Sequence, residues 1–505
     1  MDIVSYSYAD EAHTRLNNLS AGNDYNPVAS GTLTNGDQVV LNTDGTVEVL
    51  AGSQSSQSED VGSEVVFNLS STQGISSTFD STNNKVIVAY RDEGNSSYGT
   101  AIVGTVSGNS ISFGSPTVFN TSYTVESSLV YDSTNNKVIL LYRDGGNSFY
   151  GTAIVGTVSG NSISFGSPTV FNTATTFYIS STFDSANNKV IVAYKDIGNS
   201  SYGTAVVGTV SGTSISFGSE VVFNTANTSY ISSVYDTSNN KVIVAYKDGG
   251  NSDYGTAVVG AVSGTSISFE SPTVFNTATT VYISSTFDSA NNKVIVAYND
   301  IGNSSYGTAV VGTVSGTSIS FGSEVVFNTA NTSYISSVYD TSNNKVIVAY
   351  KDGGNSDYGT AVVGAVSGTS ISFESPTVFK SGNPYGSATV YDTSNNKAVI
   401  VYQDIGNSSY GTAVVYQPAG VTITSNADKF IGYANEDASD TENVSALISG
   451  KVVSGLTGLT QGVEYYLDYD GTLVTSATPY TTSPIGIALS ATELLLKGAG
   501  DAVSL

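Results

Sequence analysis

Short alternating segments dominate the repeated part of this chain, and no stretch of the repeat unit shows the 3.6-residue periodicity of an amphipathic helix. Between residues 178 and 224, four segments alternate or carry β-branched runs: 178–184, 189–194, 204–210 and 214–224. Gly, Asn, Asp and Ser separate these segments, which is the pattern of strands joined by turns. The stretch therefore predicts four antiparallel strands, with the fourth bent at Gly218.

The same pattern recurs at a fixed period. The string Asn-Asn-Lys ends at Lys85 and again every 52 residues, at Lys137, Lys189, Lys241, Lys293, Lys345 and Lys397. Seven copies of a four-stranded unit predict an all-β fold, a seven-bladed β-propeller. A solenoid is the alternative, but it would need capping units at both ends.

Both ends of the repeat array match parts of one blade. Residues 65–68 match the Val-Phe-Asn segment of the later units, and residues 421–423 fall where the repeat has Ser-Ile-Ser. We expect the two chain ends to share the outer strand of the last blade, which leaves no exposed edge. The predicted domains are an N-terminal hairpin segment and linker at 1–60, the propeller at 61–424 and a small β domain at 425–505.

The two flanks of the array carry a matched motif. Leu-Thr-x-Gly at 33–36 and Asp-Gly-Thr at 44–46 recur with the same spacing at 459–462 and 470–472. Asp-Gly between alternating apolar residues predicts a hairpin. We expect the flanks to pack together as one small β module.

Two double-blade blocks are almost identical. Residues 171–275 and 275–379 differ only where Phe177 is replaced by Val281 and Lys195 by Asn299. The near-identity predicts that the two blocks perform the same task.

Composition narrows the possible partners. The net charge of −25 disfavours nucleic acid and anionic membranes, because both carry phosphate. No stretch approaches the ~20 apolar residues of a membrane-spanning helix. Cys is absent, and the N-terminus lacks the basic and apolar regions of a secretion signal. We therefore expect synthesis in a cytoplasm and exit by another route, such as lysis.

The residues offer little for catalysis, and we expect no enzyme activity and no cofactor or metal. The only histidine is His13, so one chain cannot assemble a Ser-His-Asp triad or a multi-His metal site. A sialidase would need three arginines, but only Arg91 and Arg143 lie in the repeats.

A carboxylate pair could hydrolyse a glycan. The Asp before each Gly-Asn loop recurs in every unit, which favours an Asx turn over a calcium site. The non-repeated carboxylates are Glu93, Glu126, Asp253 and Asp357.

The candidate binding residues are aromatic and amide side chains. A tyrosine precedes Gly-Thr-Ala in every unit, where it can stack on a sugar or pack between blades: Tyr98, Tyr150, Tyr202, Tyr254, Tyr306, Tyr358 and Tyr410. Asn95, Asn199 and Asn303 lie in the Gly-Asn loops. Phe177 and Tyr385 lie in the variable connections 173–178 and 381–386, which correspond to 121–126 and 225–230. We expect these connections to share a face with the Gly-Asn loops and to bind a ligand if their variation is functional.

The motifs also resemble known proteins. The unit NNKVIVAY–GNSSYGTA–SISFGS resembles repeats of tail-fibre and virion proteins of tailed phages, especially marine ones. The run ADKFIGYANEDASD is similar to a small domain of phage structural proteins. The resemblance implies a non-enzymatic virion component that binds a host surface glycan or protein, within an oligomeric assembly that the flanks join to other virion proteins. A glycan-degrading tail enzyme and a purely architectural capsid or tail decoration remain open.

Overall fold

The structure is a computed structural model. It describes residues 27–42, 44–425, 430–435, 437–443, 446–447, 451–468, 470–478 and 484–496, so His13 lies outside the described residues. The chain divides into two compact units. Ser58–Ala419 contains the repeats, and Met1–Gln57 together with Gly420–Leu505 contains both flanks.

Each repeat forms one four-stranded antiparallel sheet, as the alternation predicts. In the first sheet, the second half of β5 (Val65–Asp80) is the inner strand, followed by β6 (Lys85–Asp92) and β7 (Tyr98–Ser107). β8 (Ser110–Phe113) and the start of β9 (Thr117–Asp132) both pair with β7 and form the bent outer strand. The rest of β9 then begins the next sheet. The connections between blades are therefore mostly extended strand, where the sequence suggested loops.

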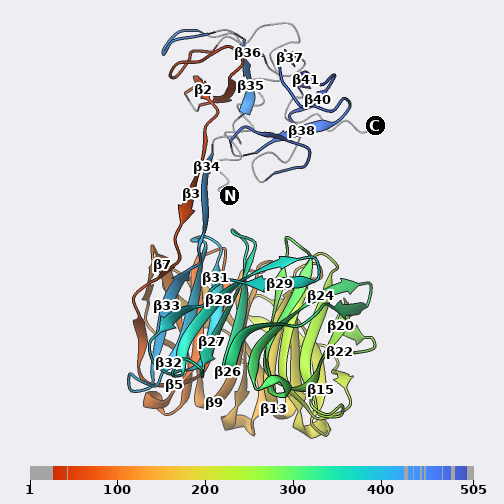
Figure 1. The fold of residues 1–505 in the computed structure, drawn as a ribbon. Coiled ribbons are helices and arrows are strands. Elements are labelled where there is room, and N and C mark those ends of the chain that lie inside the picture. Colours follow the sequence, from red (N-terminus) through yellow and green to blue (C-terminus); the bar gives the residue numbers. More distant parts are fainter. Residues whose placement is uncertain are drawn as a thin grey trace. The chain divides into compact units, whose positions relative to one another are not determined.

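The other repeats follow the same order (Figure 1). Their second strands are β10 (Lys137–Asp144), β14 (Lys189–Asp196), β19 (Lys241–Asp248), β23 (Lys293–Asp300), β27 (Lys345–Asp352) and β32 (Lys397–Asp404). Their third strands are β11 (Tyr150–Ser159), β15 (Tyr202–Ser211), β20 (Tyr254–Ser263), β24 (Tyr306–Ser315), β28 (Tyr358–Ser367) and β33 (Tyr410–Gln417).

The short outer strands and the segments that join blades complete the sheets. The outer strands are β12 (Ser162–Phe165), β16 (Ser214–Phe217), β21 (Ser266–Phe269), β25 (Ser318–Phe321) and β29 (Ser370–Phe373). The joining segments are β13 (Thr169–Asp184), β17 (Val221–Asn224) with β18 (Thr228–Asp236), β22 (Thr273–Asp288), β26 (Val325–Asp340), and β30 (Thr377–Lys380) with β31 (Pro384–Asp392). Four Gly-Asn loops contain a 3-10 turn: η1 (Glu93–Asn95), η2 (Gly145–Asn147), η3 (Ile197–Asn199) and η4 (Ile301–Asn303).

The N-terminal strand closes the ring. The first half of β5 pairs with β33 of the last blade, and its second half pairs with β6 of the first. One hydrophobic cluster joins Val86 and Val88 of the first blade to Val399 and Val401 of the last. The sheets thus form a closed β-propeller with one blade per repeat, and the expectation that both ends of the array meet in one blade is confirmed.

One detail of the expected closure is wrong. Residues 421–423 do not enter the last blade, because β34 (Gly420–Ser425) pairs with β3 (Gly52–Gln57) instead. The outer positions are taken by β4 (Asp60–Val61) and β5. Pro418 explains the difference, since its ring holds φ at about −65°, away from the values of a central antiparallel strand, and β33 ends just before it at Gln417.

The hydrophobic cores lie between neighbouring blades. Ile87 of the first blade and Val138 of the second belong to one cluster, in which Phe119 packs on Tyr142 with ring centroids 5.1 Å apart. A Cβ atom on Gly99 would lie only 2.5 Å from the Phe119 ring, so this strand position requires glycine. Each blade is therefore stabilised by burial against both of its neighbours.

The flanks form one small β unit, as their matched motifs predict. One sheet has the order β2 (Val47–Val49), β1 (Gln38–Leu41), β35 (Phe430–Ala434), β36 (Ala446–Leu447). The other has the order β37 (Val452–Ser454), β41 (Glu493–Leu496), β40 (Gly486–Ala488), β38 (Glu464–Leu467), β39 (Leu473–Val474). Both expected Asp-Gly hairpins are present, as β1–β2 and β38–β39. Val40 and Leu50 of the N-terminal flank pack with Tyr433 and Leu467 of the C-terminal flank.

Candidate functional site

The inner strand of every blade has the same irregularity. Its pairing with the second strand shifts register, for example between Phe177 and Ser180, and one residue of each bulge has a positive φ. These residues are Gly74, Glu126, Tyr178, Tyr230, Tyr282, Tyr334 and Gly386, with φ between 46° and 59°. A left-handed conformation costs a non-glycine residue about 1–2 kcal/mol. Backbone strain of this kind occurs at functional sites, and a bulge is a common device for redirecting a side chain.

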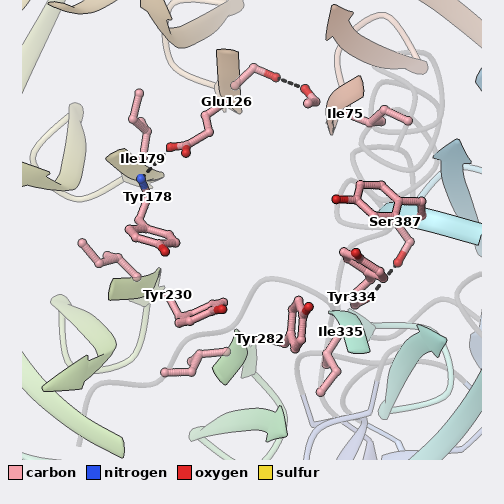
Figure 2. Close-up of a pocket in the computed structure, with 14 residues that line it drawn as sticks. Ile75, Glu126, Tyr178, Ile179, Tyr230, Tyr282, Tyr334, Ile335 and Ser387 are labelled. Carbon is pink, nitrogen blue, oxygen red and sulfur yellow. Dashed lines mark hydrogen bonds between the residues drawn. The ribbon is translucent and has the colours of Figure 1, made fainter. Parts of the chain in front are cut away.

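The bulge residues line a cavity on the axis of the propeller. The cavity has a volume of about 520 Å³, and its described lining includes Glu126, Tyr178, Tyr230, Tyr282 and Tyr334. Ile75, Ile179 and Ile335 lie one residue further along their strands, and the last blade adds Tyr385 and Ser387. Figure 2 shows these side chains arranged around the cavity.

The tyrosines form a continuous arc over successive blades. Ring centroids are 5.3 Å apart for Tyr178 and Tyr230, 5.6 Å for Tyr230 and Tyr282, and 5.2 Å for Tyr282 and Tyr334. Tyr385 continues the arc, 4.4 Å from Tyr334. Burial raises the pKa of Tyr178 and of Tyr230, so their hydroxyl groups remain protonated donors at neutral pH. The arc therefore offers ring faces together with phenol hydrogen-bond donors.

Glu126 stands at one end of the arc. Its Oε2 accepts a hydrogen bond from the Tyr178 backbone N–H at 2.6 Å. Burial raises the pKa of Glu126, and the positive charges of Arg143 and Lys195 partly oppose that rise. Glu126 is the only carboxylate in the described lining of the cavity.

A basic layer lies beside the cavity. It consists of one residue on each second strand, opposite the residue that precedes the bulge. Five of these residues are basic and two are neutral amides: Arg91, Arg143, Lys195, Lys247 and Lys351, with Asn299 and Gln403. Ion pairs join Arg91 to Glu93 at 2.6 Å, Lys247 to Asp253 at 3.2 Å and Lys351 to Asp357 at 3.3 Å. Three of the four non-repeated carboxylates are thus partners of the basic layer.

Of the candidate binding residues predicted from the sequence, some lie at the cavity and the others lie away from its described lining. Tyr385 lines the cavity, and the Phe177 ring lies 6.4 Å from that of Tyr178. The repeated tyrosines, Tyr98 to Tyr410, begin the third strands and are outside the described lining. Asn95, Asn199 and Asn303 are exposed in the Gly-Asn loops.

Two predictions about these loops are confirmed. Asp92 Oδ1 accepts a hydrogen bond from Gly94 N at 3.0 Å, which is the expected Asx turn. Gly249 N donates to Asn227 O at 2.8 Å, so a variable connection does share a face with a Gly-Asn loop.

The sequence reasoning missed the four bulge tyrosines as a group. A signal was present, because Glu126, Tyr178 and Tyr230 end three of the variable connections. Their common role depends on the bulge, which the alternation of the sequence does not reveal.

Comparisons with known proteins support no function. No protein-family model matches the sequence, and a search of curated proteins finds no match. Similar solved structures include the β-propeller domain of Cps50 (Swd1) from Myceliophteria thermophila, with a TM-score of 0.48 and 7% identity over 71% of this chain and 99% of that one. The SapL1 lectin in complex with alpha methyl fucoside has a TM-score of 0.40 and 13% identity over 61% and 97%. A leech intramolecular trans-sialidase has a TM-score of 0.42 and 10% identity over 72% and 70%. Such low values say nothing about the ligand of this chain.

Within the described ranges, no helix has the length and hydrophobicity that crossing a membrane requires.

Proposed function

We propose that this protein binds a carbohydrate in the axial cavity and does not transform it. The observation that carries the proposal is the arc of tyrosines held in left-handed backbone conformations. A sugar ring presents an apolar face that stacks on aromatic rings, and its hydroxyl groups pair with phenol groups. The cavity volume of about 520 Å³ suits a small oligosaccharide, since ligand pockets commonly measure 300–1,000 Å³.

Binding is favoured over hydrolysis by the number of carboxylates. Glycoside hydrolysis ordinarily uses two carboxyl groups that flank the scissile bond. The described lining of the cavity supplies only Glu126, and Glu93, Asp253 and Asp357 are held in ion pairs. Hydrolysis by Glu126 with an unassigned partner is the second candidate, and release of reducing ends from a bound glycan would support it.

The test is a glycan-array screen followed by calorimetric titration of the best ligand. We expect the double variant Tyr230→Gly/Tyr282→Gly to bind at least about fivefold more weakly, because each lost stacking contact contributes about 0.5–1.5 kcal/mol. The matched control is Tyr254→Ala, which removes a repeated tyrosine outside the cavity lining. If the double variant keeps its affinity and Tyr254→Ala loses affinity, the binding site lies at the outer loops and not in the axial cavity.

We also propose that this binding attaches a virus particle to its host. The support is the sequence resemblance to tailed-phage virion proteins, and the flank unit is the proposed connection to other virion proteins. Purified protein should bind host cells and their isolated surface polysaccharides, and mass spectrometry should detect the chain in purified particles. Absence from the particles would contradict this role without affecting the binding site.

A further inference from the structure

The two near-identical blocks differ at a single place in the fold. Their only differences are Phe177 against Val281 and Lys195 against Asn299. Phe177 and Lys195 are direct cross-strand partners in one blade, and Val281 and Asn299 are partners in the other. Both changes therefore fall on one paired position, directly before the bulge that carries Tyr178 or Tyr282. The blocks therefore differ in structure at this one paired position beside the cavity.

Arg143 is held against Phe177 without polar partners. Its guanidinium carbon lies 4.0 Å from the centroid of the Phe177 ring and 5.2 Å from that of Phe149. Its Nε is buried and has no hydrogen-bond partner among the described residues. The rings of Phe177 and Phe149 fix the plane of the guanidinium group. They provide no hydrogen-bond acceptor for its N–H donors.

Arg91, at the same position of the preceding blade, is fully engaged. It binds Glu93 at 2.6 Å and the Tyr123 hydroxyl at 3.0 Å, and it also donates to the side chain of Gln73. The positions of Gln73 and Glu93 are occupied by Val125 and Gly145 in the blade of Arg143. Because Val125 and Gly145 have no side-chain acceptor, Arg143 lacks the two acceptors that Gln73 and Glu93 give to Arg91.

Lys195 adds a second cation at the same place. Among the described residues it has no carboxylate within ion-pair distance, unlike Lys247 and Lys351. Arg143 and Lys195 are the two cations whose charges act on Glu126, so two cations face one carboxylate here. In the other block, Asn299 is 1% exposed and donates to the backbone oxygens of Ser305 and Thr332. In that block, the amide donor at this position is therefore used in hydrogen bonds within the protein.

We propose that Arg143, Lys195 and Phe177 form a subsite for an anionic group, the carboxylate or sulfate of an acidic sugar. The sugar ring would lie on the tyrosine arc, and the anion would meet the free edge of the Arg143 guanidinium and the Lys195 ammonium. Charge-assisted bonds of this kind are stronger than neutral ones. The inference rests on the proposed carbohydrate site of the axial cavity and specifies its ligand class.

The experiment compares an oligogalacturonate, its uncharged methyl ester and a sulfated galactan fragment by calorimetric titration. The variant is Phe177→Val/Lys195→Asn, which installs residues that this chain already carries at 281 and 299 and should therefore fold. We expect a ten- to hundredfold loss of affinity for the charged probe and less than a threefold change for the ester. The matched control is Lys247→Asn, which removes a cation already paired with Asp253 and should weaken binding less than threefold.

The results separate the two proposals. Equal affinity of the parent protein for oligogalacturonate and its ester, with no preference for the sulfated probe, refutes the anionic subsite and leaves carbohydrate binding intact. Preference for the sulfated fragment identifies the anion as sulfate. Failure of all three probes, and of every neutral glycan in the array screen, contradicts both proposals.

Discussion

Phe67 offers the sharpest test of ring closure. It lies in the N-terminal strand β5, is 8% exposed, and packs on Tyr90 and Phe113 of the first blade with centroids 5.2 and 5.5 Å away. A Cβ atom on Gly411, in the third strand of the last blade, would lie 2.5 Å from its ring. The side chain therefore contacts both blades that meet at the closure.

The expected magnitude follows from this burial. Replacing a buried phenylalanine by alanine costs about 3–5 kcal/mol, so Phe67→Ala should lower the free energy of unfolding by that amount. Phe223 is the internal reference, because it is equally buried at 8% and packs on Tyr246 and Phe269 at 5.2 and 5.6 Å. Phe223→Ala should cost the same, although its blades are continuous in sequence.

Guanidinium unfolding followed by circular dichroism measures both variants. Equal losses and a single transition are expected, because a closed ring couples every blade to two neighbours. A cost below about 1 kcal/mol for Phe67→Ala, with the full cost for Phe223→Ala, would show that the N-terminal strand is not docked in solution.

Three further predictions concern closure and the cavity. Deleting residues 61–70 should expose β33 as an unpaired edge and cause aggregation, detected by light scattering; a deletion that melts like the intact protein would contradict this. Tyr230→Gly should leave the melting temperature almost unchanged while binding weakens, since relief of the φ of 51° offsets the lost ring contacts; a large drop in melting temperature would mean that the tyrosine is structural. Burial raises the pKa of Glu126 above its ordinary value of 4.5, so its stabilising contribution is complete below pH 4.5 and declines as the pH rises through the higher folded value. The free energy of unfolding of Glu126→Gln, measured by denaturation at several pH values, should not show that decline.

Local pattern and period were sufficient to predict the propeller. Alternation within 178–224 predicted four strands and the bend at Gly218, and the recurrence of Asn-Asn-Lys predicted the number of units. These features are encoded within one repeat, where side-chain direction follows from the period of a strand. The matched Asp-Gly-Thr motifs likewise predicted both flank hairpins, because turn chemistry is local.

The site required the tertiary structure. Its described lining takes two residues from each blade, at positions about 52 residues apart in sequence, and only ring closure brings them together. Glu126 and Tyr178 were visible as variable residues, but their inward direction depends on a bulge that a regular strand pattern does not predict. That Arg143 and Lys195 form no ion pair within the described residues was equally hidden, because ion pairing depends on side chains of neighbouring strands and blades. Propensity and period act within a repeat, whereas the site consists of contacts between repeats.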